Sequence, residues 1–371
     1  MFIEVKGIGF PNKGAELMLA AIERELEKRL PKAKLAVEPQ ADFSERSRFK
    51  LWTIARWRKW GVNFASVFGL IPRKIRHRFG IVLESELNAT LDASGFTYGD
   101  QWGAEKAQVR LDSVVAKPLI LMPQALGPFT ESSLRKVMNT IVAQSALVFA
   151  REGTSYDYIR ELSAADTIYQ APDFTNTLSV SLAEPWDKET HRTAFIPNAK
   201  MLEMKNDNDA YINFMAALLA HAVAVGANPF MLIHEGRKDK ALGEQIIAKA
   251  NVEVPLSQPS SAVEVKAIIG QCELVVSSRF HGLVSALSQA VPVLATGWSH
   301  KYAMLLDDYG VSEYLVDERK DTERAKELLS ELQSGDKRQR LGEQLAERAA
   351  QEKEKTEAMW EKVVSELKGA R

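Results

Sequence analysis

The sequence predicts an α/β protein with two parallel-sheet domains that face a ligand cleft, followed by helices at the C-terminus. Three observations lead to this prediction. The chain has 371 residues, a length that suits two domains of ordinary size. Short apolar runs alternate with helical patterns, which is typical of parallel sheets covered by helices. This alternation stops in the polar, proline-containing stretch 181–191 and then starts again.

The first domain is predicted over residues 1–185. A strand in "MFIEVKGIGF" leads through the turn "PNKGAE" into a helix, whose apolar residues Leu19, Ile22, Leu26 and Leu30 recur at spacings of three and four. Four further apolar segments predict strands that end in polar or glycine-rich loops: "AKLAVEPQ", "ATLDASGF", "PLILMPQALGPF" and "ALVFARE".

The second domain is predicted over residues 186–317, where the strand–helix pattern resumes. Its strands are expected in "RTAFIP", "PFMLIHEG", "VEVPLS", "CELVVSS" and "VPVLAT". Its helices are expected at 209–225, 240–250, 261–270, 280–289 and 300–309. Residues 318–371 are rich in Glu, Lys, Ala and Leu, which predicts terminal helices.

The composition narrows the class of protein. A net charge of −1 gives no overall attraction to nucleic acid or membrane. The single cysteine, Cys272, excludes a disulfide framework and a cysteine-based zinc site. The N-terminus is strand-like rather than a signal peptide, and "GANP" splits the longest apolar window. We therefore expect a cytoplasmic protein without a membrane span.

The segment "SSRFHGL" is the strongest candidate site, because it lies where a strand passes into a helix. Ser277 or Ser278 can cap that helix. Capping does not explain Arg279 and His281, because positive charge is disfavoured at a helix N-terminus. An anionic ligand would remove this conflict, and His281 could donate a proton near neutral pH.

Polar loops also follow strands of the first domain. The turn with Asn12, Gly14 and Glu16 could hold an anion or a sugar hydroxyl at a helix N-terminus. Alternatively, Asn12 only caps the helix. Ser94, Asp100 and Gln124 could line a sugar pocket, although such loops also arise from turn geometry alone.

Further cations follow other strands. Arg151 could clamp a carboxylate or phosphate, or could form a surface ion pair. Lys301 and His300 add positive charge at the start of a late helix, where Trp298 could stack on a ring or pack in the core. His234 is a secondary candidate. No compact His/Asp/Glu cluster appears in the sequence, so we expect no obligatory metal.

An insertion at residues 44–80 is strongly basic. It holds ten Lys and Arg residues against Glu45, interleaved with Trp52, Trp57, Trp60, Phe64 and Phe68. On short helices, this mixture suits an anionic membrane surface. It could equally be a packed insertion with a solvated basic face. No nucleic-acid-binding motif accompanies it, so no nucleic acid is expected as a partner.

The segment 277–310, "SSRFHGLVSALSQAVPVLATGWSHKYAMLLDDYG", resembles the signature of the polysaccharide pyruvyl transferase family. "NKGAELM" and "FAREGTSYDYI" resemble motifs of that family in the same order, so the resemblance spans about residues 7–310. It implies two Rossmann-like domains in a GT-B-like architecture. It also implies transfer of pyruvate from phosphoenolpyruvate to sugar hydroxyls as a ketal, in cell-surface or exopolysaccharide synthesis.

The resemblance also assigns roles to residues. It implies that Arg279 and His281 form the donor-site pair on the second domain's side, and Arg151 and Lys301 match the family's mid-chain arginine and late lysine. We add Ser278 to the donor side, and ketal formation needs a proton donor, for which His281 is the best candidate. Asn12, Gly14 and Glu16 match an acceptor-side loop that often carries Asp in place of Glu16. We add Ser94, Asp100 and Gln124 to the acceptor side. The base toward the sugar stays open among Asp100, Glu16 and His234.

The expected partner is a glycan or lipid-linked oligosaccharide, and the basic insertion suggests peripheral contact with the inner face of the cell membrane. Phosphoenolpyruvate is expected as donor, without an obligatory cofactor. Two alternatives remain. One is a GT-B-like glycosyltransferase that places Arg279 and Lys301 on a nucleotide-sugar diphosphate. The other is a non-catalytic, membrane-associated scaffold for polysaccharide assembly.

Overall fold

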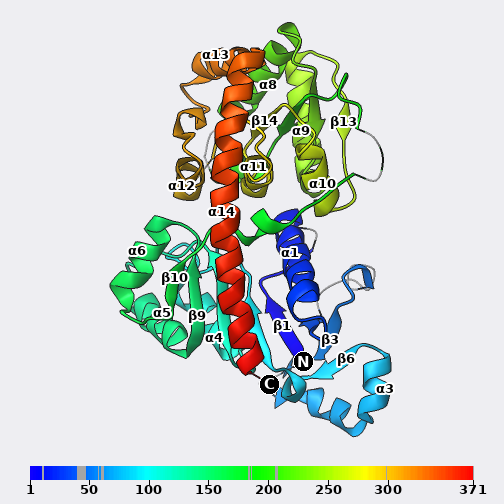
Figure 1. Cartoon of the computed structure of the whole chain (residues 1–371), viewed down its shortest axis with the longest axis vertical. Coiled ribbons are helices and arrows are strands. Elements are labelled where there is room, and N and C mark those ends of the chain that lie inside the picture. Colours follow the sequence, from blue (N-terminus) through cyan, green and yellow to red (C-terminus); the bar gives the residue numbers. More distant parts are fainter. Residues whose placement is uncertain are drawn as a thin grey trace. The chain divides into compact units, whose positions relative to one another are not determined.

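The computed structural model describes residues 1–10, 12–39, 47–56, 58–59, 62–182, 184, 186–204, 208–297 and 299–370. The chain divides into two units, and Figure 1 traces their elements in sequence order. Unit 1 consists of Met1–Phe10, Met18–Phe174 and Lys355–Arg371. Unit 2 consists of Pro11–Leu17 and Thr175–Glu354.

Unit 1 contains an eight-stranded, wholly parallel sheet in the order β10-β9-β8-β7-β1-β2-β3-β6. Its strands are β1 (Phe2–Lys6), β2 (Lys34–Val37), β3 (Trp52–Ala55), β6 (Ile81–Leu83), β7 (Ala89–Asp92), β8 (Leu119–Gln124), β9 (Ser145–Ala150) and β10 (Ile168–Gln170). The central strands β1, β7 and β8 are buried along their whole length, as expected for a parallel sheet covered on both faces.

The helices of unit 1 follow its strands. They are α1 (Lys13–Arg29), which begins in unit 2, α3 (Arg73–Arg78), α4 (Gly103–Asp112), α5 (Ser132–Gln144) and α6 (Gly153–Leu162), with the 3₁₀ turns η1 (Phe64–Leu70) and η2 (Glu84–Glu86). A third 3₁₀ turn, η3 (Phe174–Thr177), begins in unit 1 and continues into unit 2. The apolar face predicted for the first helix is confirmed, because Leu19, Ile22 and Leu26 of α1 and the following Leu30 are all buried.

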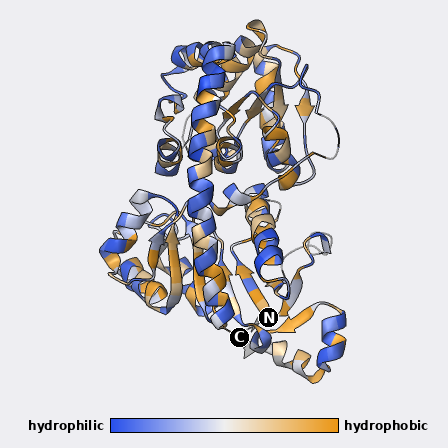
Figure 2. Cartoon of the chain, viewed as in Figure 1, coloured by the Kyte–Doolittle hydropathy of each residue, from blue (hydrophilic) through white to orange (hydrophobic). Residues whose placement is uncertain are grey.

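Unit 2 contains a five-stranded parallel sheet in the order β13-β12-β11-β14-β15. Its strands are β11 (Thr193–Ile196), β12 (Pro229–Leu232), β13 (Leu256–Ser257), β14 (Leu274–Ser277) and β15 (Val293–Ala295). All five lie in the segments in which the sequence predicts strands. Figure 2 shows that the strands of both sheets are mostly hydrophobic, as buried sheets require.

The helices of unit 2 alternate with its strands, and the last of them continues into unit 1 from Lys355 onward. They are α7 (Lys200–Met204), α8 (Asn208–Ala224), α9 (Gly236–Ala250), α10 (Ala262–Ile269), α11 (Phe280–Leu287), α12 (His300–Asp308), η4 (Ser312–Tyr314), α13 (Thr322–Gln333) and α14 (Gly335–Gly369). The predicted terminal helices are therefore confirmed. Among the described helices, none has the length and apolar content of a bilayer-spanning segment.

The insertion 44–80 contains short helices, as we expected, in η1 and α3, but it also contains strands. It supplies β3, which pairs with β2 and β6 inside the sheet, and the antiparallel pair β4 (Arg58–Lys59) and β5 (Val62–Asn63). Ile54 of β3 is fully buried, and Trp52 packs edge-on against Phe2 at 4.8 Å between ring centroids. In the sequence, the surrounding basic residues obscure this short strand. Trp57 and Trp60 lie outside the described residues.

The division into units also differs from the predicted boundaries. The chain passes from unit 1 to unit 2 after Phe174 rather than within 181–191, and α14 belongs to unit 1 from Lys355 onward. One cause is a long-range aromatic contact: the buried Trp360 of α14 packs edge-on against Phe174. Contacts between such distant segments leave no local signal in the sequence.

Candidate functional site

The carboxyl edge of the unit 2 sheet gathers most of the predicted cationic residues. Strands β11, β12, β14 and β15 each lead directly to a helix N-terminus, at α7, α9, α11 and α12 respectively. Because parallel strands end at the same edge, their loops meet there. Helix N-termini offer unpaired N–H groups and a positive dipole end. This edge is therefore suited to an anionic ligand.

Arg279 lies at the N-cap position of α11, directly after β14. Its guanidinium donates to Glu235 through Nη1 and to Asp239 through Nη2, the latter at 2.6 Å. Burial alone would lower the pKa of Arg279, but the charges of Asp239 and Glu235 hold that pKa above its ordinary value. Within the described part of the chain, Nε has no hydrogen-bond partner. Arg279 is thus a fixed, charged donor.

His281 lies in the first turn of α11, beside the ring of Phe280 at 5.5 Å between centroids. Gly14, in the first turn of α1, lies against its imidazole: a β-carbon at position 14 would be 2.5 Å from Nδ1 of His281. Lys301 lies near the ring of Phe280, with Nζ 5.1 Å from the centroid of that ring. The structure thus brings Gly14, His281 and Lys301 together within unit 2.

His234 follows β12 and is almost completely buried. Burial lowers its pKa well below the ordinary value, and the charges of Arg279, His281 and Lys13 lower it further. Its imidazole is therefore neutral at physiological pH. Nδ1 has no hydrogen-bond partner among the residues that the structure describes, so a bound ligand could engage it.

The loop predicted to bind the acceptor also makes structural contacts in unit 2. Asn12 accepts a hydrogen bond from the Ala15 amide and so caps α1, which is the alternative that the sequence left open. Glu16 is buried, and its Oε1 accepts from the amide of Ala262 at the start of α10. These contacts attach the start of α1 to unit 2. Acceptor binding by this loop stays a prediction.

Ser278 supports the loop that carries Arg279. Its buried hydroxyl is hydrogen-bonded to that of Tyr211. Its carbonyl accepts from Nδ2 of Asn198 at 2.9 Å and from the hydroxyl of Tyr302 at 3.0 Å. The observed contacts of Ser278 therefore position the loop, and its contact with a donor stays a prediction.

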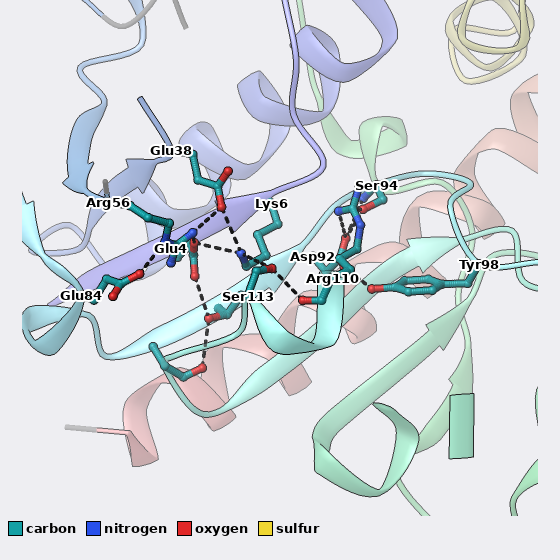
Figure 3. A network of polar contacts seen from close by, with 12 residues as sticks. Glu4, Lys6, Glu38, Arg56, Glu84, Asp92, Ser94, Tyr98, Arg110 and Ser113 are labelled. Carbon is teal, nitrogen blue, oxygen red and sulfur yellow. Dashed lines mark hydrogen bonds and ion pairs between the residues drawn. The ribbon is translucent and has the colours of Figure 1, made fainter. Parts of the chain in front are cut away.

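Unit 1 carries a second polar cluster at the carboxyl edge of its own sheet (Figure 3). The ammonium of Lys6 lies 3.1 Å from Glu4 and 3.5 Å from Glu38. Arg56 donates to Glu4 at 2.9 Å, to Glu84 at 2.5 Å and to Glu38. None of the five side chains is more than 34% exposed, so charge pairing is what permits their burial.

The neighbouring strand continues this cluster, because Lys6 of β1 lies opposite Asp92 of β7. Asp92 accepts from the hydroxyl of Tyr98 at 2.6 Å and from Arg110 at 3.4 Å. Burial, followed by the charge of Asp92, raises the pKa of Tyr98 well above its ordinary value. Arg110 also donates to the hydroxyl of the predicted acceptor residue Ser94.

Sequence reasoning missed several of these residues. It named Ser94 but not Asp92 or Arg110 beside it, and Arg279 but not its partner Glu235. The available signal was a carboxylate at the end of each apolar run, "ATLD" and "LIHE". A buried strand rarely carries a carboxylate without a partner.

The remaining predicted residues lie mainly in unit 1. Arg151, after β9, is buried and pairs with Asp173 at 3.4 Å. Asp100 accepts from the amide and hydroxyl of Thr130. Gln124, the last residue of β8, is buried, and its Nε2 lies 3.5 Å from the carbonyl of Asp92. In unit 2, His300 begins α12, and Trp298 lies outside the described residues.

The two α/β units, each built on a parallel sheet, define a fold shared with glycosyltransferases and nucleotide-sugar epimerases. The HepE protein of Anabaena, solved with UDP and glucose, is 13% identical, with a TM-score of 0.61 and 98% of each chain covered. A putative UDP-N-acetylglucosamine 2-epimerase from Listeria monocytogenes is 12% identical, with a TM-score of 0.59, covering 93% of this chain and 90% of that one. A glycosyltransferase from Rickettsia africae is 10% identical, with a TM-score of 0.57, covering 99% and 98%. The predicted GT-B-like fold is confirmed.

The family of this protein is identified by a sequence match that includes the residues of this site. The family model described as polysaccharide pyruvyl transferase matches residues 12–300, from the loop before α1 to the start of α12. The protein therefore belongs to the polysaccharide pyruvyl transferase family and is a transferase. This confirms the resemblance noted in the sequence.

Proposed function

We propose that this transferase moves the pyruvyl group of phosphoenolpyruvate onto two hydroxyls of a glycan, as a ketal, during synthesis of a cell-surface polysaccharide or exopolysaccharide. The proposal rests on the positions of Arg279 and His281 at the carboxyl edge of the unit 2 sheet. Arg279 is the N-cap of α11, and His281 lies in the first turn of that helix. Both residues lie inside the segment that the family model matches.

The donor carries a carboxylate and a phosphate, so its site needs several cationic or N–H donors. Arg279 supplies a planar guanidinium, which binds carboxylates and phosphates in a bidentate manner. Lys301 adds a second cation near Phe280, and the N-termini of α9, α11 and α12 add backbone donors. Arg151 of unit 1 is our third proposed donor-binding cation.

The chemistry assigns His281 the role of general acid. It gives a proton to the methylene carbon of phosphoenolpyruvate, while a first sugar hydroxyl adds to the adjacent carbon. The C–O bond to phosphate then breaks, and a second hydroxyl closes the ketal through an oxocarbenium-like state. Of the two hydroxyl protons, one returns to His281 and the other leaves with inorganic phosphate, so the histidine is regenerated.

Thermal unfolding of the purified protein with phosphoenolpyruvate, and separately with nucleotide sugars, tests this proposal. A ligand that binds only the folded state should add about 2.7 kcal/mol at a hundredfold excess over its dissociation constant. We expect phosphoenolpyruvate to stabilise the wild type but not Arg279→Ala. Arg324→Ala, at a half-exposed surface arginine of unit 2, is the matched control and should retain the shift.

Other outcomes point to the alternatives. Stabilisation by a nucleotide sugar, without an effect of phosphoenolpyruvate, would indicate a glycosyltransferase. No stabilisation by either ligand would contradict both enzymes and favour the non-catalytic scaffold.

We also propose that the acceptor is lipid-linked and that residues 67–79 contact an anionic membrane at the inner face of the cell membrane. The exposed fractions of Leu70, Phe79 and Val67 are 84%, 73% and 58%, which is unusual for large apolar residues on a solvated surface. Lys74 and Arg78, four residues apart on α3, are also exposed. The half-buried Trp52 ring, by contrast, packs against the rings of Phe2 and His77.

Charge supports a lipid partner over self-association. The sequence holds no acidic residue between Glu45 and Glu84. Glu84 and Glu86 are already paired with Arg56 and Arg76. Two copies joined through this basic surface would repel each other, whereas anionic headgroups would attract each copy.

Co-sedimentation with phosphatidylcholine vesicles, with and without phosphatidylglycerol, tests this contact. Lys74→Gln with Arg78→Gln should weaken binding to anionic vesicles about thirtyfold, from about 1 kcal/mol per cation. Leu70→Ser with Phe79→Ser should also weaken it. The control Val109→Ser, at a 63% exposed valine of α4, should not. Equal binding by all variants would contradict the contact.

A further inference from the structure

The guanidinium of Arg279 is engaged by two carboxylates. Its two terminal nitrogens each donate to a different carboxylate, Glu235 at Nη1 and Asp239 at Nη2. A carboxylate-bearing ligand binds a guanidinium through these same N–H groups. A donor anion that uses Nη1 must therefore displace Glu235.

The two carboxylates differ in how firmly they are held. Asp239 is completely buried, and its Oδ1 also accepts from the amide of Ala199 at 3.0 Å. This second bond ties it to the loop between β11 and α7. The Glu235 side chain is 24% exposed, and this residue is the N-cap of α9 without a side-chain capping bond. Asp239 is thus fixed by the fold, whereas Glu235 can rotate toward solvent.

We propose that Glu235 occupies the donor-carboxylate position on Arg279 until phosphoenolpyruvate displaces it, while Asp239 positions the guanidinium throughout. This inference rests on the proposed donor site. The exchange replaces one carboxylate by another on the same cation, so it costs no hydrogen bond. Glu235 also gives Nη1 an acceptor between turnovers, when a largely buried N–H group without one would be costly.

The exchange sets the affinity for the donor. When only a fraction of the protein is competent to bind, the apparent dissociation constant rises by the inverse of that fraction. If Glu235 holds Arg279 about nine-tenths of the time, the apparent constant is about tenfold above the intrinsic one. Glu235 is therefore an affinity-determining residue, and it favours release of carboxylate-bearing ligands.

Calorimetric titration of Glu235→Gln with phosphoenolpyruvate tests the inference. The amide removes the competing charge but keeps the size of the side chain, so we expect binding about tenfold tighter than in the wild type. Pyruvate, which carries only the carboxylate, should show the same gain. The gain in affinity for inorganic phosphate should be smaller, because phosphate does not replace the Glu235 carboxylate by another carboxylate.

Glu203→Gln is the matched control. Glu203 is exposed and pairs with Lys238 at 2.8 Å. The hydrogen bond with Lys238 and its charge lower the pKa of Glu203, and the charge of Arg279 makes a smaller contribution in the same direction. Substitution of Glu203 therefore removes a negative charge from the same neighbourhood without freeing a nitrogen of Arg279. Binding of phosphoenolpyruvate should change less than twofold. If Glu203→Gln and Glu235→Gln gain affinity equally, the gain comes from the loss of a nearby negative charge rather than from competition for Arg279. That result would overturn the inference.

The remaining outcomes separate this inference from the proposed function. Wild-type protein that binds phosphoenolpyruvate, with Glu235→Gln binding equally or more weakly, would overturn the role of Glu235 alone. Failure of wild type, Glu203→Gln and Glu235→Gln to bind would overturn the proposed donor and the inference with it. Thermal unfolding of each variant without ligand shows whether a loss of binding reflects a loss of folding.

Discussion

Gly14 lies so close to the imidazole of His281 that no side chain fits between them. A β-carbon at position 14 would lie 2.5 Å from Nδ1 and 3.1 Å from Cε1 of His281. Contacts this short do not occur between a real β-carbon and a neighbouring atom, so one of the two groups would have to move. The glycine in "NKGAELM" thus helps to set the position of the proposed acid.

We expect Gly14→Ala to lower turnover more than it weakens donor binding. Displacing a reacting group by about 1 Å can cost about a hundredfold in rate, and the three heavy atoms nearest to the β-carbon position of Gly14 belong to His281 and Asn12 rather than to Arg279. Phosphate release with acceptor, compared with calorimetric binding of phosphoenolpyruvate, measures the two effects. Gly9→Ala is the control, since no heavy atom lies within 4 Å of its β-carbon position. Unchanged turnover in Gly14→Ala would show that the position of His281 is not critical.

His281→Gln should reduce turnover by about two to four orders of magnitude, the usual contribution of a general acid. The fold should persist and phosphoenolpyruvate should still bind. His221→Gln, at a histidine of α8 that is hydrogen-bonded to Ser330, is the matched control. Full turnover in His281→Gln would eliminate its role as the acid.

His234 should make stability depend on pH. Burial lowers its pKa well below 6.5 in the folded state, so the unfolded chain takes up a proton first as the pH falls. The stabilisation is complete above 6.5 and is lost as the pH drops below that value, by about 1.4 kcal/mol at one pH unit below it. Urea unfolding of wild type and His234→Gln at about pH 8 and pH 5.5 measures this difference.

Wild type and His234→Gln must be compared because a second group, Glu23, titrates in the same pH range. Burial and the charge of Glu27 raise the pKa of Glu23 to about 7. Glu23 therefore loses stabilisation as the pH rises toward 7, the opposite direction to His234, and it does so in both proteins. If wild type and His234→Gln lose stability in parallel on acidification, His234 is not a buried neutral histidine.

Tyr98→Phe should destabilise the protein by about 2 kcal/mol. It removes the 2.6 Å hydrogen bond to Asp92 and leaves a buried carboxylate with one donor fewer. Chemical denaturation measures the change in the free energy of unfolding. Tyr156→Phe, at a partly buried tyrosine of the same hydrophobic cluster, should cost less. Equal effects would mean that the Asp92 network adds nothing to stability.

Much of the fold followed from the sequence alone. The alternation of apolar runs and helical periods depends on local backbone geometry, so it predicted both parallel sheets and the buried face of α1. The position of Arg279 and His281 after a strand was also readable, because a cationic pair at a helix N-terminus conflicts with the helix dipole. These features require only neighbouring residues.

Other features were decided by tertiary structure. The pairing of Arg279 with Glu235 and Asp239 arises because β12 and β14 flank β11 in the sheet. The contact of Gly14 with His281 arises because the start of α1 packs in unit 2. The insertion joined the sheet through β3 despite its basic composition, since burial of Ile54 outweighed the local pattern. Such contacts join residues far apart in the chain, and sheet order rather than local propensity determines which of them meet.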